Sequence, residues 1–237
     1  MTGTLTRAFL AAAMLTLAPL TVAHAASINY GDMSGDSVAF VDIEEATVTD
    51  APPLYGTPTP AADTLVFDPT FASASADGAA DTTSGTLTLQ VIAEPGKTIE
   101  SIAIIEWFDA DLLGVDPAGT TAAMISGLLV VQDLTAGHSL DIYQSVLDVL
   151  GILGTPPWIF DLTPFDGSLI ARAELDLAGL GITHVGLTFN NNLQTISIEG
   201  TSAAIAKSGI ELHIITPEPA SLCLLGLGVM CLSLRRR

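Results

Sequence analysis

Basic residues are scarce in this sequence, and their scarcity limits the partners that the chain can bind. Lys and Arg number 7 against 26 Asp and Glu in 237 residues, which gives a formal net charge of −19. Such an anionic protein is repelled by nucleic-acid phosphates and by anionic lipid headgroups. We therefore predict no nucleic-acid partner, whereas divalent cations, cationic surfaces or plain repulsion between copies fit the charge.

Cysteine is absent from the whole chain except its last stretch, which holds Cys223 and Cys231. Many small secreted domains are held together by disulfides, and the residues before this stretch cannot form them. A length of about 190 residues is nevertheless enough to bury one sizeable hydrophobic core. We therefore predict one domain that relies on its core rather than on disulfides.

Catalytic motifs are lacking as well. No Gly-x-Ser-x-Gly elbow is present. The histidines His138, His184 and His213 have no short-spaced Cys or His partner that would complete a zinc site. We predict that the protein is not an enzyme and that it has no cofactor, apart from the calcium hypothesis given below.

The N-terminus has the three parts of a secretory signal. Arg7 supplies the positive flank, an uncharged apolar run follows it, and Ala23 and Ala25 form a small-x-small site. Cleavage by signal peptidase before Ala26 is therefore predicted. Residues 1–25 then form the signal peptide and do not belong to the fold.

The C-terminus carries an uncharged apolar run from Ala220 to Leu234, closed by Arg235, Arg236 and Arg237. About fifteen helical residues rise roughly 22 Å, which is short of a ~30 Å hydrocarbon core but tolerable if the bilayer thins. By the positive-inside rule, the arginines keep the C-terminus cytoplasmic and leave the rest outside. We predict a short transmembrane helix that holds the chain in the inner membrane during export.

Pro217, Glu218 and Pro219 stand immediately before this run. The tripeptide, its place near the end, the apolar segment and the basic stop together resemble a PEP-CTERM sorting signal. The resemblance covers residues 217–237 and is silent on the exported domain, residues 26–216. It implies export in a Gram-negative bacterium that makes exopolysaccharide, with exosortase as the partner that recognises and processes the tail.

Apolar and polar residues alternate with a period of two through much of the domain, which is typical of strands with one buried face. The alternation is clear in residues 86–93, 169–177, 183–190 and 210–215. Further strands are predicted at residues 38–48, 64–67, 99–107, 127–133, 138–143 and 195–199. Turn signals separate the strands, among them NNN (190–192) and KSG (207–209), and residues 139–153 could be helical instead. Many short strands favour an all-β fold, an antiparallel β-sandwich of jelly-roll or immunoglobulin-like type.

The two tryptophans are the candidates for contact with sugars. Trp107 and Trp158 could each supply a flat ring for stacking on a polysaccharide, although a Trp at a strand end more often belongs to the core. Carboxylates lie close to Trp107 in the sequence, at Glu106, Asp109 and Asp111. Such a pair could catalyse glycoside hydrolysis, but in a chain this acidic some carboxylates lie near any residue by chance.

A calcium site is a further hypothesis. Asp109, Asp111 and Asp116 fall within one short stretch, and Ca²⁺ takes six to eight oxygen ligands that clustered carboxylates can supply. The stretch does not match the EF-hand pattern. The alternative is that these aspartates belong to a solvated acidic surface that binds no metal.

These features lead to three functional hypotheses. The first is a non-enzymatic protein of the cell surface or extracellular matrix, with a structural or adhesive role linked to exopolysaccharide or biofilm. The second is a carbohydrate-binding module for the matrix polysaccharide, and the third is a glycoside hydrolase. Exposed tryptophans would favour sugar binding, and buried ones a plain core.

Overall fold

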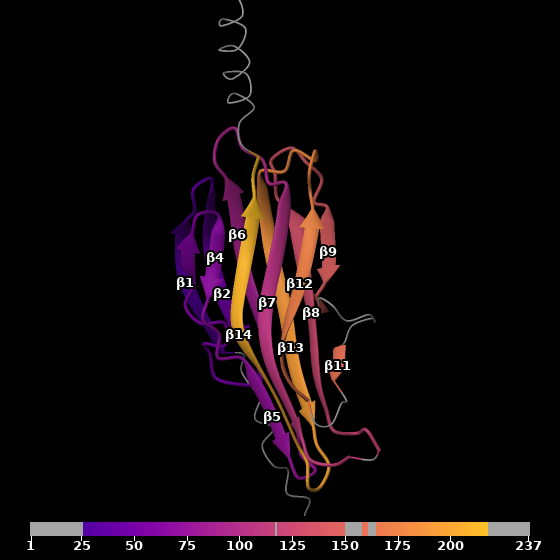
Figure 1. Ribbon diagram of the computed structural model, residues 1–237. Helices are drawn as coiled ribbons and strands as arrows, with labels where there is room; N and C mark the ends of the chain where they lie inside the picture. Colours follow the sequence, from indigo (N-terminus) through magenta and orange to yellow (C-terminus); the bar gives the residue numbers. More distant parts are fainter. Residues whose placement is uncertain (1–25, 117, 150–157, 161–164, 218–237) are drawn as a thin grey trace, which may run out of the picture.

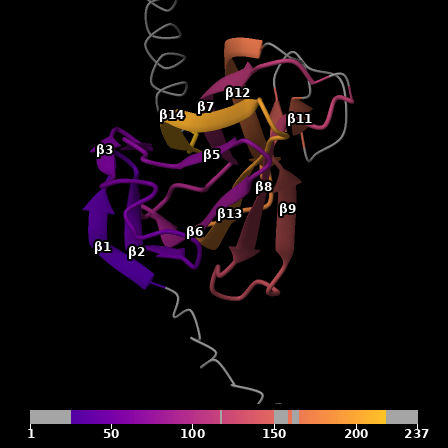
Figure 2. The same cartoon turned by 90° about the horizontal axis from the view of Figure 1, so that it is seen from below.

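The computed structural model describes residues 26–116, 118–149, 158–160 and 165–217, which form β-strands and their connections. The strands make two antiparallel sheets that lie face to face, seen along their length (Figure 1) and from one end (Figure 2). The prediction of an all-β fold with antiparallel sheets is confirmed, while the jelly-roll or immunoglobulin-like type stays a prediction.

Sheet A has the strand order β1-β2-β6-β13-β8-β11, and β9 also pairs with β8. In chain order its strands are β1 (Ala26–Ser34), β2 (Val38–Thr47), β6 (Ala80–Ala93), β8 (Ala122–Asp133), β9 (Ile142–Val146), β11 (Trp158–Phe160) and β13 (His184–Ile196).

Sheet B has the strand order β10-β12-β7-β14-β4-β3, and β5 also pairs with β14. In chain order its strands are β3 (Thr59–Ala61), β4 (Thr64–Phe67), β5 (Ala72–Ala76), β7 (Ser101–Leu113), β10 (Asp148–Val149), β12 (Phe165–Asp176) and β14 (Ser202–Ile215). The last strand of the domain, β14, therefore lies inside the sheet, between β7 on one side and β4 and β5 on the other.

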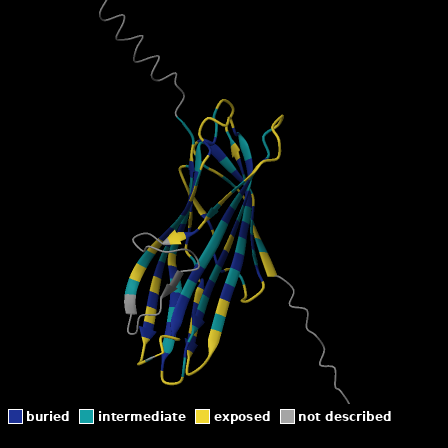
Figure 3. Cartoon of the chain, turned by 90° about the vertical axis from the view of Figure 1, so that its right-hand side faces the viewer, coloured by how far each residue is buried: buried dark blue, intermediate teal, exposed yellow. Residues whose placement is uncertain are grey.

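The period-two pattern of the sequence places one face of each long strand in the core. Buried and exposed residues alternate along the strands (Figure 3). Leu87 and Leu89 of β6, for example, point inward and lie in register with Phe189 and Leu187 of β13. Full burial of each such side chain contributes about 1.5–3 kcal/mol, so these inward rows hold the two sheets together.

Several strands are longer than the sequence predicts, and two of the turn signals lie inside strands. The asparagines 190–192 are in the middle of β13, and residues 207–209 form a bulge in β14, where the register shifts between Lys207 and Gly209. The predicted strand at 195–199 is only the end of β13. Residues 142–146 and 148–149 are strands rather than a helix, because their backbones pair with β8 in sheet A and with β12 in sheet B.

A proline-rich segment before β3 is fastened to the core by a buried carboxylate. Both Leu54 and Tyr55 donate their backbone N–H groups to the Glu45 carboxylate. The Tyr55 hydroxyl donates to the carbonyl oxygens of Gly85 at 3.2 Å and Phe189 at 3.3 Å. The fully buried ring of Tyr55 thus closes the core over sheet A.

The domain begins and ends next to the predicted processing segments. Strand β1 starts at Ala26, and β14 ends at Ile215. The predicted signal helix with Ala23 and Ala25, and the predicted helix of the tail, lie outside the described residues. Among the residues that the structure describes, no helix is long and apolar enough to cross a membrane.

Candidate functional site

Trp107 lies on the outer face of sheet B, in the middle of β7. Alternation along β7 turns Glu106, Phe108 and Ala110 toward the core, and turns Trp107 and Asp109 outward. The Trp107 ring is half-buried because it packs over Gly209 of β14. A Cβ at Gly209 would lie 3.1 Å from the ring, so the glycine allows the indole to lie flat on the sheet.

A groove of about 550 Å³ runs beside this ring. Its walls come from β7, β12, β14 and the segment around β4, and they include Ser168, Asp68 and Glu211. The Ser168 hydroxyl donates to the Asp109 carboxylate at 2.5 Å. An aromatic face bordered by hydroxyl and carboxylate groups is the combination that binds sugars, since the ring covers C–H groups while oxygens take the hydroxyls.

The other sequence-predicted aromatic residue lies in a different sheet. Trp158 is the first residue of β11 in sheet A, in register with Ile125 of β8. The structure does not describe the direction of the Trp158 side chain. The two tryptophans therefore do not share a sheet, and only Trp107 can be placed at a groove.

Asp109, Asp111 and Asp116 do not form one group. The first two are exposed on the outer face of β7, whereas Asp116 lies in the loop that follows. The Asp116 carboxylate accepts backbone N–H groups of Ala118 at 2.9 Å, Thr120 at 2.6 Å and Thr121 at 2.5 Å. These bonds, that of Thr121 above all, hold the pKa of Asp116 below its ordinary value.

Metal binding receives no geometric support from this arrangement. Within the described ranges, no three His, Cys, Asp or Glu side chains gather as a metal site. The hydrogen bonds of Asp116 explain its position as a cap for its own loop. The calcium hypothesis for the three aspartates stays a prediction.

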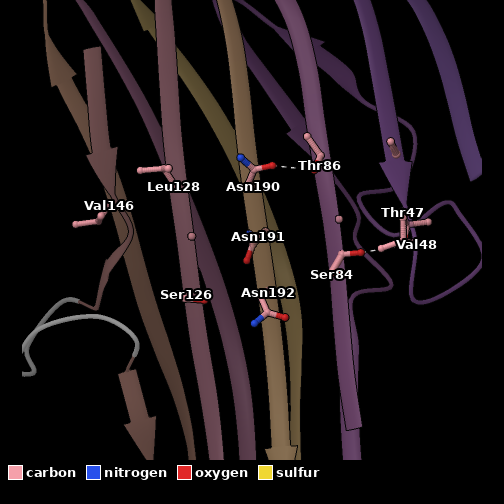
Figure 4. A pocket seen from close by; sticks show the side chains of 13 residues that line it. Thr47, Val48, Ser84, Thr86, Ser126, Leu128, Val146, Asn190, Asn191 and Asn192 are labelled. Atoms are coloured by element: carbon pink, nitrogen blue, oxygen red, sulfur yellow. Dashed lines mark hydrogen bonds between the residues drawn. The ribbon is translucent and has the colours of Figure 1, made fainter. Parts of the chain in front are cut away.

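A second groove, of about 700 Å³, hollows the outer face of sheet A (Figure 4). Asn190 and Asn192 point into it from β13, beside Thr86 of β6, and the Thr86 hydroxyl donates to Asn190 Oδ1 at 2.8 Å. Exposed Val48 and Val146 flank these polar groups. This groove could not be predicted from the sequence, because consecutive asparagines are more typical of turns than of central strands.

A cluster of charged and amide groups that was not predicted from the sequence lies inside the core. The Lys207 ammonium and the Glu106 carboxylate form an ion pair at 2.6 Å, and both side chains are completely buried. The Asn191 side-chain amide donates to the same oxygen, Glu106 Oε1, at 2.5 Å. The alternation of the sequence could have indicated the buried position of Lys207, because Ala203, Ile205 and Lys207 are alternate residues of β14 and all three face the core.

Glu106 is therefore no partner for Asp109 or Asp111 in glycoside hydrolysis. Its side chain points into the core, whereas the two aspartates project from the opposite face of the same strand. A pair that includes Glu106 is therefore separated by the sheet itself, whereas Asp109 and Asp111 share the outer face.

Comparison with known proteins identifies the tail. Residues 216–237 match the family model for the PEP-CTERM protein-sorting motif, which confirms the resemblance stated above. The chain is thus an exported protein with a C-terminal sorting signal. That signal is of the PEP-CTERM type, and it implies exosortase as the processing partner.

Two further comparisons concern the chain as a whole. No match is found among curated proteins. A solved structure that matches is the enzymatically active domain of tailspike protein 4 from bacteriophage CBA120, with 12% identity and a TM-score of 0.24. The match covers 81% of this chain but 19% of that one, and at such a TM-score it carries no argument about fold or function.

Proposed function

We propose that the exported domain is a non-enzymatic protein of the cell surface or extracellular matrix, with a structural or adhesive role linked to exopolysaccharide or biofilm. The observation that carries this proposal is the order of the chain. A two-sheet domain ends at Ile215, and a PEP-CTERM motif spans the residues directly after it. A further part of the proposal is a Gram-negative host, in whose inner membrane the tail is anchored until exosortase acts.

Processing of the tail tests the route. We expect the mature surface form to lack residues 222–237, because the apolar run and the arginines serve only to present the tripeptide. Intact mass of the protein recovered from the cell surface measures this directly. A surface form that still ends at Arg237 would replace the removable signal with a permanent anchor.

The adhesive role is tested in the producing bacterium. Deletion of residues 26–216, with the signal peptide and tail retained, is expected to weaken the retention of cells in the matrix. Restoring the complete chain should recover it. Equal retention in the deletion strain and its parent would contradict the proposal.

A specific observation favours a second candidate, a carbohydrate-binding module. Trp107 is half-exposed at a groove with Ser168, Asp68 and Glu211, whereas a purely structural Trp would be expected in the core. In this reading the ring stacks on a sugar of the matrix polysaccharide and the oxygens accept its hydroxyl hydrogens.

Substitution separates this candidate from the first. Trp107→Ala is expected to weaken binding of the full chain to exopolysaccharide from the producing strain by about tenfold or more, as aromatic anchors do. Asn192→Ala, in the groove of sheet A, is the matched control. Unchanged binding in Trp107→Ala would rule out sugar stacking on this ring. A loss of binding confined to Asn192→Ala would indicate that the sugar binds in the groove of sheet A instead.

A further inference from the structure

The cluster of Lys207, Glu106 and Asn191 is not explained by stability. Lys207 comes from β14 and Glu106 from β7, both in sheet B, while Asn191 comes from β13 in sheet A. The second carboxylate oxygen of Glu106, Oε2, and the side-chain amide oxygen of Asn191, Oδ1, are both buried without a hydrogen-bond partner. Replacing a buried ion pair by apolar residues is often neutral or stabilising, and an unpaired buried oxygen is unfavourable. The cluster therefore needs a reason other than packing.

The surroundings of Lys207 are apolar and aromatic. Its Nζ lies 4.3 Å from the centre of the Phe71 ring, and 5.6 Å from the centres of both the Tyr55 and the Phe108 rings. Burial among these rings lowers the pKa of Lys207 to about 8, although the neighbouring Glu106 charge acts in the opposite direction. An amine that can lose its proton in a dry site is a nucleophile, as in enzymes that use a desolvated lysine.

An electrophile lies within reach of this amine. Lys207 Nζ and Asn191 Nδ2 both contact Glu106 Oε1, at 2.6 and 2.5 Å, so the two nitrogens lie within about 5 Å of each other. Asn191 Nδ2 is bonded to the side-chain carbonyl carbon, Cγ. The carboxylate between the nitrogens is placed to take a proton from one and give a proton to the other.

The strands next to Asn191 carry glycines, which let the surrounding side chains pack close to its amide. Asn191 is in register with Gly85 of β6 and with Gly127 of β8. Both glycines point to the core side, where a Cβ would press on aromatic rings at 3.0–3.2 Å. Asn191 is thus flanked by two positions without side chains. The aromatic rings and Lys207 fill the space on the core side of these glycines.

We propose that Lys207 and Asn191 become joined by an intramolecular amide bond, with Glu106 transferring the protons. The Lys207 ammonium first gives one proton to Glu106. The Nζ lone pair then bonds to Asn191 Cγ, and the C=O π pair moves onto Oδ1.

Glu106 gives its proton to Nδ2 and takes one from Nζ. When the Cγ–Nδ2 bond breaks, its electron pair leaves with ammonia and the C=O bond reforms. One amine and one primary amide thus yield one secondary amide and ammonia, and no oxidant is needed. Glu106 ends as a neutral acid whose O–H can donate to the new carbonyl oxygen, Asn191 Oδ1, which has no partner before the reaction.

This bond joins sheet A to sheet B in a domain that has no cysteine. It supplies the covalent cross-link that a disulfide gives other exported domains. The inference concerns the core alone, so it does not depend on either groove or on the proposed adhesive role.

Peptide mapping of the full exported chain tests the bond, because Glu199 lies between the two joined residues. Cleavage after glutamate separates residues 175–199 from residues 200–211. We expect the two peptides to be recovered as one species, lighter than the two together by about 17 Da, the mass of the ammonia displaced by the lysine nucleophile. Recovery of the two peptides apart, each with its sequence mass, would overturn the proposal.

Variants assign the roles. Lys207→Arg is expected to give separate peptides, whereas Lys97→Arg, at the domain's other lysine, should keep the joined species. Asn191→Asp should still join but lose about 18 Da, because water replaces ammonia as the leaving group. Glu106→Gln should give separate peptides. A joined species in Glu106→Gln would overturn the role of Glu106, and one in Lys207→Arg would overturn the proposed linkage.

Discussion

Asp133 is a buried carboxylate whose charge is supported by its neighbours. It accepts the backbone N–H of Thr135 at 2.8 Å and contacts His138 Nδ1 at 2.9 Å. Burial alone would raise the pKa of Asp133, but the hydrogen bonds from Thr135 and His138 hold it below its ordinary value. Ionised Asp133 therefore fastens the turn after β8.

This lowered pKa predicts acid sensitivity with a definite sign. A carboxylate with a depressed folded-state pKa adds stability above its unfolded pKa of about 4, and that stability is lost as the pH falls through the folded value. Asp133→Asn should cost roughly 1–2 kcal/mol at pH 7, as loss of a hydrogen bond to a charged group does, and much less near pH 2. Thermal melts at both pH values measure the difference, with exposed Asp141→Asn as the control. An equal loss at both pH values would contradict the role of the charge.

Strand phase can predict the direction of a single residue, although Lys207 and Glu106 were not predicted in the core. Lys207 and Glu106 occupy inward positions of β14 and β7, so phase alone could have placed both in the core. Their pairing could not be predicted, because it depends on the bulge between Lys207 and Gly209 and on which strands are neighbours. For Trp107, the same phase argument gives the outer face, which corrects the preference for a core tryptophan.

Neighbouring strands of sheet A are matched to one another at the level of their side chains. Gly85 of β6 and Gly127 of β8 lie on either side of Asn191 of β13. Rings from elsewhere in the chain fill the space that these glycines leave. A Cβ at Gly85 would lie 3.0 Å from Phe71 Cε2 and 3.2 Å from Tyr55 Cε2.

Adding that methyl group should therefore strain the core. Gly85→Ala is expected to lower the free energy of unfolding by about 1–3 kcal/mol, the range found for overpacked cores. Gly186→Ala in β13 is the matched control, since its Cβ would meet only the flexible Leu134 Cδ1 at 3.3 Å. Denaturant melts of both variants give the values. A Gly85→Ala chain as stable as the parent would show that the rings can yield.

Elements with strict alternation were predicted well, and elements without it were not. The core of β6, β12, β13 and β14 follows directly from the pattern, because the inward residues there are apolar or small, with the exceptions of Asn191 and Lys207. Strand β5, with its sequence ASASA, carries little hydrophobic signal, and no strand is predicted there from the sequence. It forms because β14 offers it a partner, which is a tertiary effect that local sequence does not encode.

The charge of the whole domain sets how it responds to salt. Residues 26–216 keep 25 of the 26 acidic residues and only Lys97, Arg172 and Lys207, for a formal net charge of −22. Two of those cations face acidic partners, Arg172 with Glu174 at 2.6 Å and Lys207 with Glu106. Most carboxylates therefore repel one another across the surface, and added ions screen that repulsion.

Sodium and calcium chloride at matched ionic strength should then raise the melting temperature alike. A bound calcium ion would instead add stability that grows as RT ln(1 + [L]/Kd), far beyond screening. Thermal melts in the two salts decide, with Asp111→Asn as the variant. A calcium-specific rise that Asp111→Asn abolishes would restore the hypothesis of a site at Asp109, Asp111 and Asp116.

The position of β14 has a mechanical consequence. This strand leads to the sorting motif, and it pairs with β7 along its length from Ser202 to Ile215 as well as with β4 and β5. A pull on the tail enters the domain at Ile215, the C-terminal end of β14 (Figure 1), and we consider a pull along the strand axis. The hydrogen bonds on both sides of β14 are then loaded together in shear rather than one after another, as they would be if an edge strand were peeled away. Through the amide bond proposed between Lys207 and Asn191, the same load also reaches sheet A. A pull on the tail is then shared by both sheets of the domain.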